Sequence, residues 1–244
     1  MKVWACTDKG PKRTQNQDAC HAVCKPDEGW ALTAVCDGMG GAKSGNVASS
    51  LAISVFTEIV HDGVDGKISR SMLSELMRMG VVSANDAVYE MSLSSREFSG
   101  MGTTLVAAAV TEDVSVVLNV GDSRAYHISD AGISQITTDH SLVEELIGRG
   151  QLTREESVRY PGRNLITRAV GTAEQVTADI FCPEIRKGEY ILLCSDGLTG
   201  IVSDQEILFE VLHGGDSEDC CQRLVQIAVS RGAPDNVTAV LLKK

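Results

Sequence analysis

The chain has 244 residues, of which 43% are hydrophobic and 23% charged, values typical of a folded domain rather than a disordered segment. Its 22 Lys and Arg residues against 33 Asp and Glu residues give a net charge of −11, so nucleic acid and anionic membranes would be repelled. The longest plainly apolar run, residues 105–110, is far too short for a bilayer span, and no signal-peptide core follows the start. We therefore expect a cytoplasmic monomer that binds neither nucleic acid nor membrane.

The eight cysteines indicate a reducing compartment rather than a disulfide framework or a zinc site. None of them forms a Cys-x-x-Cys pair, and most lie inside apolar runs, where a reduced thiol behaves as a small hydrophobic side chain. They stand at Cys6, Cys20, Cys24, Cys36, Cys182, Cys194, Cys220 and Cys221.

The first quarter of the chain predicts three short strands followed by a helix. Apolar residues bounded by turn formers indicate strands over residues 3–7, 19–24 and 30–36. Ser44 stands at an N-cap position, and the helical period after it predicts a helix to about residue 60. The apolar stripe of this helix comprises Val47, Leu51, Val55 and Ile59, with Ala48, Ala52 and Phe56 beside it.

The rest of the chain alternates groups of strands with pairs of helices. Strands are predicted over residues 103–110, 114–120, 124–128, 189–194 and 237–242. Helices are predicted over residues 71–91, 141–150, 204–212 and 219–231. Runs of strands that look antiparallel, separated by helix pairs, favour an α+β fold over a regular strand-helix alternation. Because composition does not change along the chain, we expect one domain over residues 1–244.

Aspartates recur at the ends of the predicted core strands. Asp37, Asp122 and Asp196 each end an apolar run, whereas Asp18 and Asp235 directly precede one. A single Asp-Gly pair is usually only a turn. If these strand ends converge, however, the carboxylates would repel one another unless a cation neutralised them. A site that offers oxygen without His or Cys suits Mg²⁺ or Mn²⁺ better than zinc.

Several other hydrolytic chemistries lack their sequence signatures. No cysteine has an arginine six positions later, and neither Asp-x-Asp, Gly-x-Ser-x-Gly, a P-loop nor His-Glu-x-x-His occurs. The five histidines are scattered without ligand spacing, which disfavours a dinuclear site built on histidine.

A series of short motifs along the chain resembles those of the metal-dependent type 2C Ser/Thr protein phosphatases, the PPM family, in its bacterial single-domain form. The resemblance covers nearly the whole chain. It rests on Thr7-Asp8-Lys9-Gly10 with Arg13, Asn16-Gln17-Asp18, Asp37-Gly38-Met39-Gly40-Gly41, Gly102-Thr103-Thr104, Gly121-Asp122-Ser123-Arg124, Asp139-His140-Ser141, Cys194-Ser195-Asp196-Gly197-Leu198 and Asp235-Asn236-Val237-Thr238.

The resemblance implies a fold of two stacked antiparallel sheets flanked by helix pairs, with a dinuclear Mg²⁺ or Mn²⁺ centre at one end. It implies that Asp37 bridges two ions and that the Gly38 carbonyl binds the first of them. Asp196 and Asp235 would hold the second ion, while Asp18 would ligate the first or orient its water.

Three further roles follow from the same resemblance, and one role is left unassigned. Arg13 matches the arginine that binds the substrate phosphate, and Asp122, with Asp196, matches a third metal site of bacterial members. Asn236 would support the ligands from a second shell. Many eukaryotic members have a histidine directly after Asp-Gly that is thought to protonate the leaving group; Met39 stands there, so the general acid is unassigned and a metal-bound water is the default.

Arginines are concentrated in residues 149–168, called the flap segment here because the family places its flap there. We expect Arg159 and Arg163 to contact groups around the phosphorylated residue, since arginine pairs well with phosphate and carboxylate. The competing interpretation is a solvated helix and loop in which Glu155 and Glu156 balance the arginines.

The sequence therefore predicts a phosphatase that hydrolyses phosphoserine and phosphothreonine by direct attack of a metal-activated water. Its partners would be phosphorylated proteins, with a cognate Ser/Thr kinase supplying them. A catalytically inactive member acting as a sensor or binding module is the first alternative, although such a member normally shows lost metal ligands. A hydrolase of small phosphoesters or nucleotides is the second alternative.

Overall fold

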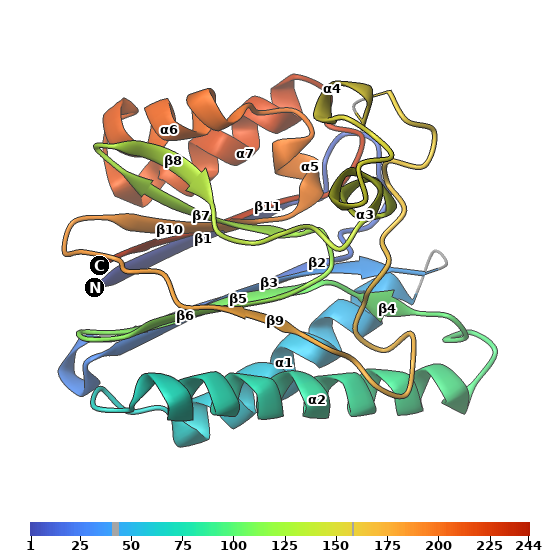
Figure 1. Cartoon of the computed structure of the whole chain (residues 1–244), viewed down its shortest axis with the longest axis horizontal. Coiled ribbons are helices and arrows are strands. Elements are labelled where there is room, and N and C mark those ends of the chain that lie inside the picture. Colours follow the sequence, from blue (N-terminus) through green and yellow to red (C-terminus); the bar gives the residue numbers. More distant parts are fainter. Residues whose placement is uncertain (41–43, 158) are drawn as a thin grey trace.

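The computed structural model describes residues 1–40, 44–157 and 159–244. Two antiparallel sheets lie face to face, and each carries a pair of long helices on its outer face (Figure 1). The five-stranded sheet has the order β1 (Lys2–Asp8), β11 (Val237–Lys243), β10 (Tyr190–Cys194), β7 (Arg124–Ser129) and β8 (Gly132–Gln135). The other sheet has the order β2 (Asp18–Lys25), β3 (Trp30–Met39), β5 (Leu105–Thr111), β6 (Ser115–Val120) and β9 (Asp179–Phe181), with β4 (Gly102–Thr103) paired to β3.

The helices are divided between the two sheets and one end of the sandwich. Helices α1 (Gly45–Gly63) and α2 (Arg70–Ser94) cover the sheet that contains β3, whereas α6 (Asp204–His213) and α7 (Cys220–Ser230) cover the other (Figure 1). Helices α3 (Leu142–Gly148) and α4 (Arg154–Ser157) lie at the end of the sandwich opposite to the chain termini (Figure 1). The short elements are α5 (Asp196–Thr199) and the 3₁₀ turns at Pro26–Glu28 and Ser217–Asp219.

Three apolar layers hold this arrangement together. The layer between the sheets includes Val35, Val106 and Leu193, and the two outer layers join each sheet to its helix pair. Strands β5 and β6 are buried at every residue because both of their faces are covered. This explains why their sequences are continuous apolar runs rather than alternating ones.

The α+β fold with two antiparallel sheets and flanking helix pairs is confirmed, with local differences. The strand predicted over residues 103–110 is divided into β4 and β5, because Thr104 donates its backbone N–H to the Asp37 carbonyl at 2.9 Å. Strands β8 and β9 were not predicted. On α1 the most deeply buried row is Ala48, Ala52, Phe56 and Val60 rather than the predicted stripe.

Two further predictions concern compartment and membrane. All eight cysteines are free thiols. Among the described residues, no helix combines the length and apolar character that crossing a bilayer requires.

Candidate metal centre

The aspartates at the strand ends come together where the two sheets meet. Asp18 and Asp37 are direct cross-strand partners in the β2–β3 ladder. Asp196 follows β10 and Asp235 precedes β11, and these two strands are neighbours in the other sheet. Antiparallel pairing within each sheet therefore brings carboxylates that are far apart in sequence to one end of the sandwich.

Asp18 joins the two sheets through its carboxylate. Its Oδ2 accepts hydrogen bonds from Thr238 Oγ1 at 2.6 Å and Ser195 Oγ at 2.8 Å. Both hydroxyls come from the side of the opposite sheet, since Ser195 directly follows β10 and Thr238 lies in β11. The Oδ1 atom is buried and has no partner among the described residues, so one lone-pair face of Asp18 is left for a ligand.

Asp37 is fixed through its backbone. Its N–H donates to Thr104 Oγ1 at 2.8 Å, and its carbonyl accepts from the Thr103 hydroxyl at 2.9 Å. The next residue, Gly38, must be glycine, because a Cβ there would collide with the carbonyl oxygen of Gly45 at the start of α1. Gly41, the last residue of this motif, lies outside the described residues.

Asp122 lies in a tight loop between β6 and β7, which we call the Asp122 loop (residues 121–123). Gly121 has a φ of +108°, and a Cβ on it would strike the Thr104 side chain, so this position favours glycine. The Ser123 hydroxyl lies 2.7 Å from Thr104 Oγ1, the group that accepts the Asp37 N–H. One threonine therefore connects the Asp122 loop to Asp37.

The carboxyl groups perturb one another strongly. Burial raises the pKa of Asp18 to about 6, against hydrogen bonds that lower it, and repulsion from Asp196 and Asp235 adds to the rise. Burial and then repulsion from Asp196 and Asp139 raise the pKa of Asp122 to about 7. Burial, and to a smaller extent repulsion from the neighbouring carboxylates, raises the pKa of Asp37 well above its ordinary value. Burial also raises the pKa of Asp196. A cation is the natural way to stabilise so many buried carboxylates in their charged form.

Arg13 and Asp235 form an ion pair at the mouth of this cluster. The Arg13 guanidinium donates to Asp235 Oδ2 at 2.6 Å, and the two side chains are 48% and 29% exposed. A substrate phosphate and a cation would each compete for one member of this pair. Both residues line a cavity of about 500 Å³ that also touches Asp122, Asp196 and Arg163.

Asn236 supports the loop that carries Arg13 rather than touching the carboxylates with its side chain. Its carboxamide donates to the carbonyls of Lys9 and Gln15 at 2.8 and 2.9 Å and accepts the Gln17 N–H at 2.9 Å. These three bonds fix both ends of the segment between Lys9 and Gln17.

The flap segment places its arginines in different environments. Arg149 pairs with Glu145 and Arg154 with Glu144, whereas Arg168 donates to Asp179 at 2.9 Å. Arg163 lines the cavity. Arg159 is exposed and is not among the residues that line it.

The donor set fits a hard divalent cation. It offers carboxylates together with the Gly38 backbone carbonyl, and the buried Oδ1 atoms of Asp18 and Asp196 have no partner among the described residues. Among the described residues, no three His, Cys, Asp or Glu side chains are already arranged so that they could hold one metal ion. The ion pair that Asp235 forms with Arg13 is consistent with this, because it occupies one of the carboxylates. Mg²⁺ commonly keeps several water ligands, so a complete protein cage is not required.

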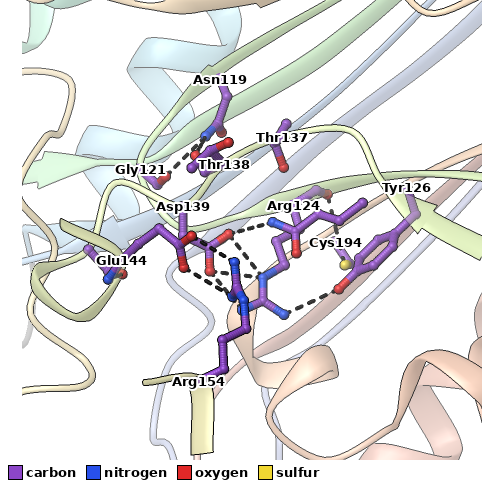
Figure 2. A network of polar contacts seen from close by, with 12 residues as sticks. Asn119, Gly121, Arg124, Tyr126, Thr137, Thr138, Asp139, Glu144, Arg154 and Cys194 are labelled. Carbon is purple, nitrogen blue, oxygen red and sulfur yellow. Dashed lines mark hydrogen bonds and ion pairs between the residues drawn. The ribbon is translucent and has the colours of Figure 1, made fainter. Parts of the chain in front are cut away.

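Several supporting residues lie within the predicted motifs without having been given a role. Ser195, Thr238 and Thr104 hold Asp18 and Asp37, and their adjacency to motif aspartates is the signal that could have identified them. Arg124 forms a fork with Asp139, with its Nε 3.0 Å and its Nη2 2.7 Å from carboxylate oxygens (Figure 2). This pair also lines the cavity.

Comparison with known proteins agrees with this geometry. A family model for Protein phosphatase 2C matches residues 11–238. Protein phosphatase PhpP of Streptococcus pneumoniae is 34% identical over 244 residues, covering 99% of this chain and 97% of that protein.

Solved structures give the same result in three dimensions. The serine/threonine phosphatase Stp1 from Staphylococcus aureus superposes with a TM-score of 0.91 and 37% identity, covering 100% of this chain and 94% of that one. The catalytic domain of the serine/threonine protein phosphatase PstP, solved with two manganese ions, gives a TM-score of 0.83 and 33% identity, covering 98% and 96%. The family model and these relatives extend over almost the whole chain, which therefore belongs to the protein phosphatase 2C family of metal-dependent enzymes.

Proposed function

We propose that this chain hydrolyses phosphoserine and phosphothreonine in proteins by direct attack of water, with residues 1–244 acting as one catalytic domain. The observation that carries the proposal is that Asp18 and Asp37 lie close enough to Asp196 and Asp235 for the carboxylates to repel one another. Asp196 and Asp235 line an open cavity together with the Arg13 guanidinium. Phosphoryl transfer needs positive charge around the phosphate, and this arrangement can hold cations next to Arg13.

We propose Mn²⁺ or Mg²⁺ as the cations. Asp37 with the Gly38 carbonyl would hold one of them, and Asp37, Asp196 and Asp235 would hold a second. Asp122 with Asp196 would hold a third. When bound, the cations supply Lewis acidity that activates water and balances charge on the phosphoryl oxygens. The two manganese ions of the PstP structure support this choice.

The side chains have separable tasks in this reaction. Arg13 binds the substrate phosphate once it exchanges its Asp235 partner for phosphate oxygens, which match its planar fork equally well. Asp18, held on one side by two hydroxyls, offers its unpaired Oδ1 to orient the attacking water. Asn236 keeps the Arg13 segment in place.

Protonation of the leaving group is not assigned to Met39, whose thioether carries no proton. Met39 pairs with Gly102 in the short β3–β4 ladder, which supports a role in packing. We propose that water supplies this proton.

Its substrates would be phosphoproteins made by a Ser/Thr kinase, and we propose that the enzyme acts as a monomer in the cytoplasm. The eight free thiols support a reducing compartment. We also propose that Arg163, which lines the cavity, contacts groups beside the phosphorylated residue, with Arg159 further out along the flap segment.

The decisive experiment measures hydrolysis of a phosphothreonine peptide by the purified chain with Mn²⁺, with Mg²⁺ and after exhaustive chelation. We expect no turnover in EDTA and recovery on adding either ion. Full activity after chelation would exclude the mechanism, and no activity under any condition would favour the sensor or binding-module alternative. A nucleoside monophosphate tested in parallel separates a protein phosphatase from a hydrolase of small phosphoesters.

A further inference from the structure

A second cavity lies at the end of the sandwich where both chain termini are found, opposite to α3 and α4 (Figure 1). Its volume of about 490 Å³ is within the range of pockets that hold small ligands. The ends of β1 and β11 line one side of it, and the 3₁₀ turn at Ser217–Asp219 lines another. Among the described residues, none that lines this cavity belongs to the metal centre. We call it the terminal cavity.

Two lysines stand side by side at the terminal cavity. Lys2 of β1 and Lys243 of β11 are direct cross-strand partners, so their side chains leave the same face of the sheet. Like charges directly opposite each other destabilise a sheet. Among the described residues, neither lysine has a carboxylate within ion-pair distance, although Asp216 and Glu218 line the same cavity. A bound anion would relieve the repulsion between the two ammonium groups.

Contacts with a tyrosine hold one of these cations in place. The Lys243 ammonium lies 4.9 Å from the centre of the Tyr190 ring, and Tyr190 is the cross-strand partner of Lys243 on β10. The Tyr190 hydroxyl lies 3.4 Å from Ser217 Oγ, and Ser217 also lines the terminal cavity. Lys243 is therefore positioned before any ligand arrives, which reduces the entropic cost of binding.

The two tryptophans of the chain differ in a way that concerns this cavity. Trp30 is 1% exposed, and its indole N–H donates to Glu28 Oε2 at 3.0 Å. Trp4 lines the terminal cavity and is only partly buried, and its indole N–H has no partner among the described residues. An indole in this state offers a ligand both an aromatic surface and a hydrogen-bond donor.

The acidic side of the cavity narrows the class of ligand. Asp216 and Glu218 are exposed carboxylates, which would repel a compact anion such as inorganic phosphate. They can accept hydrogen bonds from sugar hydroxyls, as acidic residues do from the ribose of bound dinucleotides. A ligand that matches the whole cavity therefore has an anionic end, a planar ring and hydroxyl groups. A nucleotide combines these three parts.

We propose that the terminal cavity binds a nucleotide, with its phosphates on Lys2 and Lys243, its base against Trp4 and its ribose facing the acidic side. Bases stack on aromatic side chains whatever their sequence, and lysine binds phosphate as a compact charge. This binding goes beyond the proposed function and uses none of its residues. Because the terminal cavity and the metal centre lie at opposite ends of the sandwich, a nucleotide and a phosphopeptide can be bound together.

The first test titrates ADP into the unmodified chain in EDTA, with calorimetry for affinity and NMR of the two indole N–H groups for location. We expect one ADP per chain with a Kd below about 1 mM. The Trp4 signal should shift while the Trp30 signal stays in place. Adenosine and pyrophosphate, which each carry part of the ligand, should bind about tenfold more weakly or less tightly still. Absence of saturable ADP binding, or equal affinity for pyrophosphate, would overturn the proposal.

The second test removes the two cations. Lys2→Gln/Lys243→Gln should weaken ADP binding about tenfold, because each exposed charge contact accounts for roughly a factor of three. The matched control is Lys25→Gln/Lys67→Gln, which removes the same charge from two lysines that do not line the cavity. The control should bind ADP like the unmodified chain. Equal losses in both double variants would mean that only net charge matters and would overturn the proposal.

The third test concerns the ring and the location of the ligand. Trp4→Leu should weaken ADP binding about tenfold, and Trp4→Phe, which keeps a ring, should lose less. Arg13→Ala should leave ADP affinity unchanged. A loss in Arg13→Ala with none in the lysine variant would place ADP in the cavity of the metal centre and overturn the proposal. Phosphopeptide hydrolysis is measured separately, so a chain that binds ADP without cleaving phosphopeptide would contradict the proposed function alone.

Discussion

The carboxylates of the metal centre and the arginines of the flap segment are held in opposite ways, although they serve one cavity. Asp37 is fixed by a β-ladder and by two threonines, and Asp18 is fixed by two hydroxyls from the facing sheet. Arg149 and Arg154 are 66% and 73% exposed and are restrained by ion pairs on the surface. Exposed ion pairs contribute about 0 to 1 kcal/mol, so these arginines can exchange partners at little cost.

This contrast indicates a division of labour. Groups that must meet a cation and a phosphate with fixed geometry are placed on buried strand ends, where the backbone cannot shift. Groups that meet a variable protein substrate are placed where side chains can adapt. Substitutions should therefore have steep effects at the strand ends and graded effects along the flap segment.

The largest effect is expected for Asp37→Asn, which removes a charged ligand while preserving shape. Turnover of a phosphopeptide at saturating Mn²⁺ should fall by about a hundredfold or more, because the change strikes a ligand rather than one of its supporting partners. Circular dichroism should show that the fold survives. The exposed Asp130→Asn serves as the control, and near-normal turnover of Asp37→Asn would rule out a bridging role.

The second prediction concerns the cation-free protein and its dependence on pH. Burial raises the folded-state pKa of Asp18 to about 6, above the ordinary value of an aspartate, so folding favours the protonated form. Its contribution to stability is complete below the unfolded pKa and is lost as pH rises through the folded pKa. In EDTA, the free energy of unfolding should therefore fall between about pH 4 and pH 7.

Asp18→Asn isolates this contribution. The asparagine side chain can still accept hydrogen bonds from Ser195 and Thr238 but cannot ionise. Over that pH range, the free energy of unfolding of the variant should therefore fall by about 3 kcal/mol less than that of the parent. Asp37, Asp122 and Asp196 continue to titrate, so the decline should be reduced rather than removed. Urea unfolding at fixed ionic strength measures both curves. If the free energy of unfolding of the variant and of the parent had the same pH dependence, Asp18 would not be a carboxyl group whose pKa is raised by folding.

The fold was predictable wherever a strand is covered on both faces. Strands β3, β5 and β6 have apolar runs that no surface strand would carry. The grouping of strands between pairs of helices favoured antiparallel sheets over a regular strand-helix alternation. The strand β9 has only three residues, all partly buried, and depends on β6 for pairing. A segment so short has no periodicity of its own, and its tertiary partner decides its structure.

The site divides in the same way. Asp-Gly pairs at strand ends are visible in a sequence, because charge is rare next to a buried run. The hydroxyl of Thr238 is not visible, because its partner Asp18 lies 220 residues away and threonine is common in strands. The ion pair of Arg13 with Asp235 spans 222 residues and could not be inferred from either residue alone.

The third prediction addresses Arg13, which stands between the two regions: it contacts a buried-site carboxylate and is itself half exposed. If Arg13 binds phosphate in both ground and transition states, Arg13→Ala should raise KM about tenfold with a smaller loss in kcat. Arg13→Lys keeps the charge but loses the planar fork, so its KM should lie between those of the parent and Arg13→Ala. Steady-state kinetics with a phosphopeptide measure this. An unchanged KM would make Arg13 a surface partner of Asp235 only.

The smallest effect is expected in the flap segment, where chemistry and substrate choice should separate. The double change Arg159→Ala/Arg163→Ala should lower kcat/KM on acidic phosphopeptides about tenfold, if two exposed contacts of about 0.5 to 1 kcal/mol each add. Its rate on p-nitrophenyl phosphate should stay within about twofold of the parent, because no contact with the reacting phosphoryl group is removed.

The single variants sharpen this test, because Arg163 lines the cavity and Arg159 is not among its lining residues. Arg163→Ala should therefore account for the larger share of the loss on phosphopeptides, and Arg159→Ala for the smaller share. Arg149→Ala is the matched control, since it removes an arginine of the same segment that pairs with Glu145. The discriminating quantity is the ratio of the effects on the two substrates, measured in one Mn²⁺ buffer at one ionic strength. Equal losses on both substrates would mean that the flap segment supports the metal centre itself, and the division of labour between the two regions would not hold.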